Sequence, residues 1–477
     1  MVCAAVLVLL GIVLGTALLT DNMGERIATT TAQEVADVLS HPFSVVVQIP
    51  PISTGSTPSL VVTTTTPVTT KRAPITVPPR GSRTAQPSTH HIPEGVGKQQ
   101  QLVCIMGEGF TSVHQLPQDE VCDYIFYDSL YKNGTHNLLS DPSTYSDGLN
   151  VFLNNRRGYR HTTLGIGLAF DFVAKANEDL QYAKNPSPLE RFWKRSIFHA
   201  GILDTPMQPT RNDTRSAIKI LERIKRLVDI RRGVTAITAI SVPHPNIAWA
   251  ASFAEDFRAL RFTPSIVISI GHYRRADDKH SVCAIMPPTR HPDDIPSERI
   301  LRAYDFDLST PIHLLSWLYS NGTDTRGVVS VTLKGRWTRP VNFRNTGFFG
   351  ACSSVDIPFG SYTEVCPSGG QMSTAPLNYS TKHHAMITYI SKIRRTFTYD
   401  DERAFAEKLC RVKALRTDVP FGIAVYDVDY DDYYNSCYTL NLYRAYSRLK
   451  ALRKVVDYFK KETAPFDEAA CRTFVTG

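Results

Sequence analysis

Acidic residues at alternating positions are the first candidates for chemistry in this sequence. Two groups of them lie in the C-terminal half. The first is Asp305 and Asp307 in YDFDL, and the second is Asp427, Asp429, Asp431 and Asp432 in VYDVDYDDYY. Because a strand has a period of two, side chains at alternate positions point the same way. Carboxyls placed in this manner can act as a general acid and a general base, or bind a calcium ion.

Other polar residues follow apolar runs directly. Glu108 comes just after Leu102–Met106, and His272 and Tyr273 follow Ser265–Ile270. In a parallel barrel, residues that follow the strands form the C-terminal rim where ligands bind. A lone histidine is more often a hydrogen-bonded loop residue, and the spacing supports no Ser-His-Asp or Cys-His arrangement.

The elements that would carry these residues are short apolar runs that alternate with amphipathic stretches. The runs that we predict as buried strands are Leu102–Met106, Tyr124–Tyr127, Leu164–Phe170, Ala236–Val242, Ser265–Ile270, Val328–Leu333 and Phe421–Asp427, with either Val282–Met286 or Ile300–Asp307 as the remaining one. Helical periodicity is clearest in Arg215–Ile230, Ile247–Leu260, His383–Arg395, Glu402–Leu415 and Leu440–Phe459. About eight such strands separated by helices predict an α/β fold, a (β/α)8 TIM-type barrel with insertions, and an open doubly wound sheet is the alternative.

Charge and motif content argue against several classes of partner. The formal net charge is +8 over 477 residues, and the basic residues are scattered along helical segments such as Arg215–Arg232. We therefore expect solvated helix faces and no nucleic-acid binding. No GxGxxG or P-loop sequence follows a predicted strand, and no cysteine pair has CxxC spacing, so we expect neither a cofactor nor a metal ion.

The N-terminal part differs in composition from the rest. Val2–Thr20 is uncharged and just long enough to span a bilayer, longer than a signal-peptide core of about 7–15 residues. We favour an uncleaved signal-anchor over a cleaved signal peptide for residues 1–20, and either one places the remainder outside the cytosol. Residues 21–98 contain VVTTTTPVTTKRAPITVPP and predict a disordered stalk, either O-glycosylated or an unmodified linker.

The sequons and cysteines also indicate a location outside the cytosol. Four Asn-x-Ser/Thr sequons occur, at Asn133, Asn212, Asn321 and Asn378. Of the nine cysteines, Cys3 lies in the hydrophobic segment, and the eight that follow predict up to four disulfides in an oxidising environment. We therefore expect an extracellular glycoprotein, either secreted or held at a membrane as a single-pass type II protein.

Several segments of the globular part resemble one family. They are LVCIMGEGF and EVCDYIFYDSL near its start, VVSVTLKGRW from Val328, GSYTEVC from Gly360, RTFTYDDERAFAEKL from Arg395 and FGIAVYDVDYDDYYNSC from Phe421. Together they resemble the family-18 glycoside hydrolases, the chitinases and chitinase-like lectins. The resemblance implies a barrel over residues 99–462 with a small inserted domain at 337–378, followed by a C-terminal tail at 463–477. It also implies two disulfides, Cys104 with Cys122 and Cys366 with Cys437.

The catalytic sequence of that family does not occur in this chain. Chitin-cleaving members carry Asp-x-x-Asp-x-Asp-x-Glu on the fourth strand, where the glutamate protonates the glycosidic oxygen and the substrate's own N-acetyl group acts as nucleophile. We place the fourth strand in GVTAITAISVPHP, Gly233–Pro245, where neutral Thr235, Thr238 and Ser241 fill the acidic positions. A neutral side chain cannot deliver a proton to a leaving group, so the resemblance implies a protein without chitinase activity.

The resemblance also points to ligand-binding positions at the barrel mouth. Tyr426 corresponds to the tryptophan that forms the floor of the family's sugar site, and a tyrosine ring can still stack on a sugar. Trp337 could stack as well, although packing is the favoured role. The segment YDFDL, with Tyr304, Asp305 and Asp307, resembles the family's sixth-strand Met-x-Tyr-Asp, and Glu108 lies at the rim. The aspartates from Asp427 to Asp432 are structural in the family.

These observations predict a catalytically inactive chitinase-like protein. Its partner would be a chitin-like or other glycan, or a protein, bound at the barrel mouth. An active glycoside hydrolase with a non-standard acid, such as Asp305 or Glu108, and a purely structural surface protein are the alternatives.

Overall fold

The computed structural model describes residues 100–182, 187–243, 247–304, 307–367, 376–461 and 465–477. The predicted hydrophobic segment and stalk, together with Asp305, lie outside these residues. Among the helices of the described ranges, none is both long and apolar enough to cross a bilayer.

Eight parallel strands close into a barrel, as the sequence predicts. Their order around it is β1, β2, β3, β4, β5, β6, β7 and β14, and β14 pairs with β1. Their bounds are Leu102–Met106, Tyr124–Leu130, Thr163–Leu168, His199–Ile202, Thr238–Val242, Ile266–Ser269, Arg326–Thr332 and Gly422–Tyr426. The fold is thus a (β/α)8 barrel, and the alternative of an open sheet is wrong.

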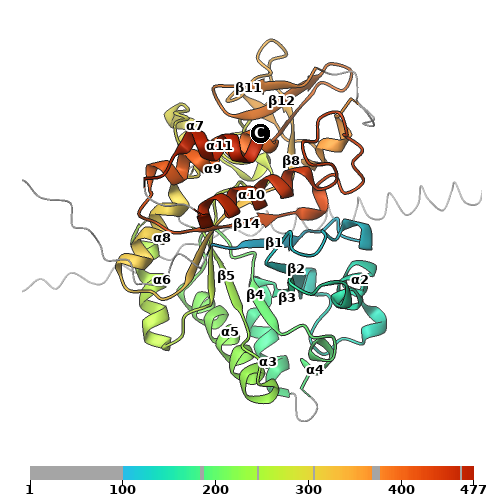
Figure 1. Ribbon diagram of the computed structural model, residues 1–477, viewed down its shortest axis with the longest axis vertical. Coiled ribbons are helices and arrows are strands. Elements are labelled where there is room, and N and C mark those ends of the chain that lie inside the picture. The colour runs from blue at the N-terminus through green and yellow to red at the C-terminus, as the bar shows by residue number, and fades with distance from the viewer. Residues whose placement is uncertain (1–99, 183–186, 244–246, 305–306, 368–375, 462–464) are drawn as a thin grey trace, which may run out of the picture. The chain divides into compact units, whose positions relative to one another are not determined.

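Helices cover the outside of the barrel (Figure 1). They are α2 (Asp147–Asn154), α3 (Val173–Tyr182), α4 (Glu190–Trp193), α5 (Arg211–Arg232), α6 (Ile247–Leu260), α8 (Thr310–Ser320), α9 (Glu402–Leu415) and α10 (Ser447–Lys461). Of the two other helices that the structure describes, α7 (Glu298–Ala303) lies beside the inserted sheet, and α11 (Glu468–Thr476) packs on α9 and α10. The longest, α5, is capped by Thr210, whose side chain accepts a hydrogen bond from the Asp213 amide, and it ends at Gly233 with φ of 62°. Only glycine adopts this left-handed geometry without strain, which fixes where the helix stops.

The barrel interior is apolar. Its buried side chains are Val103, Ile105, Phe126, Leu203, Ala239, Ile266, Ile268, Ile270, Val328, Ala424 and Tyr426. Phe126 fits because its neighbour on β3 is Gly165, where an added Cβ would lie 2.3 Å from the phenyl ring. A filled interior leaves only the ends of the barrel for binding.

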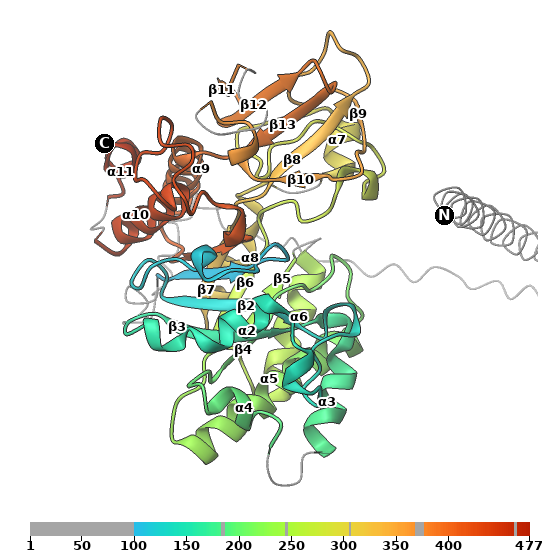
Figure 2. The same cartoon turned by 90° about the vertical axis from the view of Figure 1, so that its right-hand side faces the viewer.

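A small antiparallel sheet is inserted between β7 and β14. It runs in the order β10 (Phe359–Gly360), β8 (Gly335–Pro340), β13 (Arg395–Tyr399), β12 (Ala385–Ile390) and β11 (Asn378–Ser380), and β9 (Cys352–Ser353) pairs with β8. Figure 2 shows this sheet beyond one end of the barrel, with α9, α10 and α11 beside it. The insertion is larger than the predicted 337–378, because the expected helix His383–Arg395 is the hairpin formed by β12 and β13.

The prediction of the fourth strand was wrong. Gly233–Pro245 contains β5, the fifth barrel strand, and the fourth is β4, which had no counterpart among the predicted strands. Neither Val282–Met286 nor Ile300–Asp307 supplies a barrel strand within the described residues, and α7 occupies part of the second. β4 escaped notice because it has four residues, HAGI, with too short an apolar run to stand out.

Four disulfides tie the fold together. Cys104–Cys122 and Cys366–Cys437 are the pairs that the resemblance implies, and Cys283–Cys352 and Cys410–Cys471 are the other two. The last of them bonds α11 to α9, and Cys471 is fully buried. Residues 468–476 are therefore a packed helix where the sequence predicted a tail.

Candidate functional site

A cavity of about 260 Å³ lies at the mouth of the barrel, where the strands end. Residues that follow β1, β4, β6 and β14 line it together with Lys334, Arg336 and Phe359 from the start of the inserted sheet. This is the rim at which barrel proteins bind their ligands. We describe it as the mouth site.

The floor of the mouth site is Tyr426, at the end of β14. Its side chain is 5% exposed, and its hydroxyl donates a hydrogen bond of 2.8 Å to the carbonyl oxygen of Leu203. The imidazole of His272 packs against the phenol ring with centroids 4.7 Å apart. Burial lowers the pKa of His272 to about 3, so the imidazole is neutral at physiological pH. The floor is therefore apolar and uncharged, and its one hydroxyl is already engaged.

The fourth strand brings a carboxyl to the mouth site that sequence reasoning missed. Leu203 points into the barrel interior, and Asp204 comes next in the chain and lines the cavity. Asp204 Oδ1 accepts a hydrogen bond of 2.9 Å from the Phe170 amide. Burial, with the Asp128 carboxylate nearby, raises the pKa of Asp204 to about 6. The feature of the sequence that could have revealed Asp204 is its position, two residues after the end of the short strand HAGI.

Two lysines neutralise most of the other acids at the rim. Lys132 Nζ lies 3.3 Å from Asp128 Oδ2 and 3.4 Å from Glu108 Oε1. Lys334 Nζ lies 2.9 Å from Asp427 Oδ1. Burial by itself would lower the pKa of Lys334, but the Asp427 carboxylate raises it above its ordinary value. Ion pairs of this kind hold the rim in shape and reduce its net charge.

Arg274 is a rim cation of a different kind. Its guanidinium donates hydrogen bonds to the carbonyl oxygens of Leu203 and Thr205, at the end of the fourth strand. These acceptors are neutral, so the positive charge of Arg274 remains beside Asp204. A ligand with hydroxyl or carbonyl oxygens would find a charged donor here.

The predicted site residues are only partly brought together. Glu108 and Tyr426 line the mouth site. Trp337 is 4% exposed in the core of the inserted sheet, where its indole nitrogen donates to Glu364 Oε2 at 3.2 Å. Tyr304 is fully buried, and its hydroxyl donates to Asp277 Oδ1. Neither ring is among the residues that line the mouth site, and Asp305 lies outside the described residues.

The three neutral residues expected on the fourth strand belong to the fifth. Thr235 is exposed and precedes β5, and Thr238 is buried at the opposite end of the barrel from the mouth, next to Ser265. Only Ser241 lies near the mouth site, where its hydroxyl accepts a hydrogen bond of 3.1 Å from the Thr205 amide. Their neutrality therefore says nothing of the fourth strand itself.

All four sequon asparagines are exposed. They are Asn133, Asn212, Asn321 and Asn378. An exposed side chain is a requirement for glycan attachment, so the arrangement is compatible with the predicted modification.

Comparison with known proteins was made on sequence and on structure. No protein-family model and no curated protein matches the sequence. Solved structures do match, and the following three are 11–12% identical to this chain. A chitinase from Trichuris suis has a TM-score of 0.56 and 11% identity, with 74% of this chain and 99% of that chain covered. A family-18 chitinase from Cycas revoluta, solved with a chitooligosaccharide, has a TM-score of 0.50 and 12% identity, with 76% and 99% covered.

The chitinase-like protein YKL-39, also solved with a chitooligosaccharide, has a TM-score of 0.52 and 12% identity, with 74% and 98% covered. This chain has the fold of the family-18 chitinases. The sequence Asp-x-x-Asp-x-Asp-x-Glu, which chitin-cleaving members carry, occurs nowhere in this chain. The end of its fourth strand presents Leu203 to the interior and Asp204 to the mouth site.

Proposed function

We propose that this chain is a non-hydrolytic chitinase-like protein that binds a glycan at the mouth site. The observation that carries the proposal is Leu203, an apolar side chain facing inward at the end of the fourth strand. A hydrolase of this fold needs an acid there to protonate the leaving group. The motif that would supply it is missing from the whole sequence.

The geometry of the mouth site supports binding by polar contacts at the rim. Tyr426 is too buried to offer a free ring face, and its hydroxyl already donates to Leu203. Arg274, Lys132 and Lys334 instead surround the cavity with charged donors. Sugar hydroxyls and acetamide carbonyls are good acceptors for such groups. The structures of YKL-39 and of the Cycas chitinase with chitooligosaccharides support a glycan as the first class of ligand to test.

Asp204 supports a second candidate function, glycoside hydrolysis by a non-standard acid. A carboxyl with a pKa of about 6 can be protonated near neutral pH and donate its proton. Asp204 replaces Asp305 and Glu108 as the acid to test, because Glu108 is paired with Lys132. The cavity itself argues against the third interpretation, a purely structural surface protein.

One experiment separates the two candidates. The purified full-length protein is incubated with N-acetylglucosamine oligomers, and both binding and release of shorter products are measured, with Asp204→Asn as the matched variant. We expect binding without turnover in both proteins. Turnover that disappears in Asp204→Asn would establish the hydrolase instead, and lack of binding to any member of a glycan array would refute the glycan proposal.

We further propose that the protein is extracellular and carries N-linked glycans. Four disulfides support this placement, because they persist in oxidising compartments. Expression in secreting animal cells should yield a protein whose mass falls after treatment with an N-glycosidase. Gln substitution at Asn133, Asn212, Asn321 and Asn378 together should abolish that fall in mass.

A further inference from the structure

A second cavity, of about 320 Å³, lies beside the mouth site. It is formed by the loop that follows β14, by the turn Ser361–Glu364 of the inserted sheet and by Gly109 after β1. We call it the tyrosine–acid pocket. The two cavities are lined by neighbouring residues of the chain. Glu108 and Asp427 line the mouth site, and Gly109 and Asp429 line the tyrosine–acid pocket.

The lining of the tyrosine–acid pocket is acidic. It includes Glu364, Asp429, Asp431 and Asp432, and it contains no lysine, arginine or histidine. This composition is unusual in a chain whose net charge is +8. A cavity lined by one sign of charge attracts ligands of the opposite sign.

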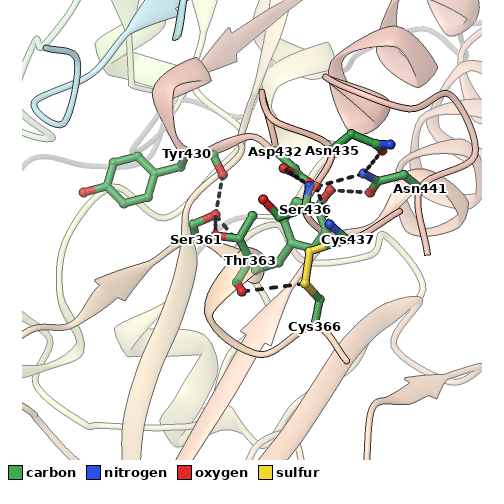
Figure 3. Close-up of a disulfide and its surroundings, with 10 residues drawn as sticks. Ser361, Thr363, Cys366, Tyr430, Asp432, Asn435, Ser436, Cys437 and Asn441 are labelled. Atoms are coloured by element: carbon green, nitrogen blue, oxygen red, sulfur yellow. Dashed lines mark hydrogen bonds between the residues drawn. A yellow bond between two sulfur atoms is a disulfide. The ribbon is translucent and has the colours of Figure 1, made fainter. Parts of the chain in front are cut away.

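Three of the four carboxylates have both oxygens engaged or a counter-charge within the protein, and one of them is Glu364, which accepts hydrogen bonds from the Ser361 amide and the Trp337 indole. Asp431 Oδ1 accepts a hydrogen bond of 3.0 Å from Arg448, which neutralises it. Asp432 accepts hydrogen bonds from the amides of Ser436 and Cys437 and from the Asn441 side chain, as Figure 3 shows. These bonds shape the loop but bring no positive charge to Asp432.

Asp429 is the carboxylate of the pocket that can still accept a hydrogen bond. Its Oδ1 accepts the Gly107 amide, but its Oδ2 is buried without a hydrogen-bond partner among the described residues. The residue is 6% exposed, and a Cβ added to Gly109 would lie 2.8 Å from Oδ2. Glycine at 109 therefore lets the Asp429 carboxylate lie close against the backbone at the edge of the pocket. An unpaired buried acceptor is destabilising, and a donor from a ligand would satisfy it.

Tyrosine rings complete the pocket. Tyr430, Tyr433 and Tyr434 line it, and the rings of Tyr433 and Tyr434 lie 4.5 Å apart at an angle of 53°. Tyr434 is 65% exposed at the entrance. Aromatic faces next to carboxylates are the recognition elements for organic cations. No group of three His, Cys, Asp or Glu side chains in the described ranges is arranged to hold a metal ion, which favours an organic cation over an inorganic one.

The frame around the pocket is rigid. The disulfide Cys366–Cys437 joins the loop after β14 to the end of the Ser361–Glu364 turn, and the Ser361 hydroxyl donates to the Tyr430 carbonyl at 3.0 Å (Figure 3). Asn441 also bonds Asn435 within the loop. A preformed pocket loses little conformational entropy when a ligand binds.

We propose that the tyrosine–acid pocket binds a protonated amine, and that this amine belongs to an amino sugar whose nitrogen is not acetylated. The choice of an ammonium group follows from this pocket alone. The choice of a sugar rests on the proposed function, because the pocket continues the mouth site and the Ser361, Thr363 and Ser436 side chains add hydroxyls to its lining. An oligomer with both acetylated and free amino groups would then extend from one cavity into the other.

The test compares the tetramers of glucosamine and of N-acetylglucosamine, which differ in the acetyl group on each nitrogen and therefore in charge, on the full-length protein by calorimetry at pH 6, where the glucosamine amines are protonated. We expect Asp429→Asn to weaken binding of the glucosamine tetramer roughly tenfold or more, because a charge-assisted hydrogen bond is lost. Binding of the N-acetylglucosamine tetramer should be unchanged. Glu364→Gln, at a more exposed carboxyl, should weaken the first ligand less and serves if Asp429→Asn fails to fold. Glu298→Gln on α7, an exposed acid outside both cavities, is the control.

A second measurement uses pH. Burial, together with the Asp427 carboxylate and against the opposite pull of Lys334, raises the pKa of Asp429 to about 6. An ammonium group requires the ionised carboxylate, so affinity for the glucosamine tetramer should rise as pH increases from 5 to 6, and should fall again where the glucosamine amines lose their own protons. The rise should be much smaller in Asp429→Asn.

The outcomes separate this inference from the proposed function. Equal affinity for both tetramers with no effect of Asp429→Asn overturns the inference and leaves glycan binding at the mouth site intact. Binding of the glucosamine tetramer alone, dependent on Asp429, supports the inference while the mouth-site proposal fails. Binding of a lysine-containing peptide in place of either sugar would overturn the sugar assignment.

Discussion

Tyr426 on the eighth barrel strand donates its hydroxyl hydrogen bond to the carbonyl oxygen of Leu203 at the end of the fourth, at 2.8 Å. This bond crosses the barrel and closes its interior at the mouth. The resemblance implies that Tyr426 takes the place of the family's sugar-stacking tryptophan, and that the fourth strand is where chitin-cleaving members carry their catalytic acid. The phenol side chain is therefore held in the packed interior, and the proposed glycan contacts are those of the rim.

The first prediction concerns this bond. Tyr426→Phe should lower the free energy of unfolding by about 1–2 kcal/mol, because the Leu203 carbonyl keeps only the longer contact with Arg274, at 3.5 Å. Urea denaturation measures the loss, and Tyr438→Phe, at a residue 65% exposed, should change stability by less than about 0.5 kcal/mol. Glycan affinity should stay unchanged in Tyr426→Phe. A fall in affinity without a fall in stability would show that the hydroxyl contacts the ligand.

The second prediction concerns pH. Because the pKa of Asp204 is raised from 3.8 to about 6, the folded state binds more protons than the unfolded state between these values. Stability from this group is therefore present at low pH and is lost as pH rises toward 6 and above, by up to roughly 3 kcal/mol. Asp204→Asn removes that loss, and its carbonyl oxygen can still accept the Phe170 amide. The difference in unfolding free energy between variant and wild type should grow from pH 4 to pH 7.

The pH effect of Asp204 must be measured as the difference in unfolding free energy between Asp204→Asn and wild type, because buried histidines also titrate. Burial lowers the pKa of His199 and His291 to about 4, and of His272 to about 3. These groups stabilise the fold increasingly as pH rises toward 6.5, which opposes the effect of Asp204 in the wild-type curve. A difference curve that is flat with pH would contradict the raised pKa of Asp204.

The barrel was predictable because its strands are buried on both faces. Seven of them show as apolar runs, and the motif around Tyr426 points to the family-18 fold that the comparisons show. The fourth strand was not predictable by this route, since its four residues include His199 and Gly201 and its identity depends on pairing with β3 and β5. The same error hid Asp204, whose place at the mouth site depends on where that strand ends.

The inserted sheet and the tyrosine–acid pocket were harder to predict from the sequence than the barrel strands. The segment His383–Arg395 has a helical spacing of apolar residues, but pairing of β12 with β13 overrides it. The aspartates from Asp427 to Asp432 stood out by their spacing. That Asp431 is neutralised by Arg448 while Asp429 keeps an unsatisfied oxygen follows only from contacts with residues far away in the sequence.

The third prediction concerns a buried ion pair at the start of α9. Lys408 Nζ lies 2.6 Å from Asp400 Oδ1, and both side chains are fully buried. Lys408→Met should destabilise the fold by about 3–5 kcal/mol, because it leaves the Asp400 carboxylate buried without a counter-charge. Lys392→Met, at an exposed lysine of the inserted sheet, should have little effect. The double variant Lys408→Met with Asp400→Leu should recover much of the loss, and a double variant no more stable than Lys408→Met would contradict this explanation.

The fourth prediction concerns the disulfide behind the tyrosine–acid pocket. Cys366 and Cys437 are 71 residues apart, and their bond ties the loop after β14 to the inserted sheet. Replacing both by serine should lower stability by about 2–5 kcal/mol, as removal of a native disulfide usually does. Hydrogen exchange should become faster in the loop from Tyr433 to Leu442, because its anchor to the Ser361–Glu364 turn is lost.

A matched control is available in the same chain. Cys410–Cys471 closes a loop of similar length, 61 residues, between α9 and α11, and neither cysteine lines the tyrosine–acid pocket. Its removal should cost comparable stability and leave both hydrogen exchange in the 433–442 loop and affinity for the glucosamine tetramer unchanged. Removal of Cys366–Cys437 should weaken that affinity, because the pocket is no longer preformed. Equal affinities in the two serine variants would show that the disulfide acts on stability alone.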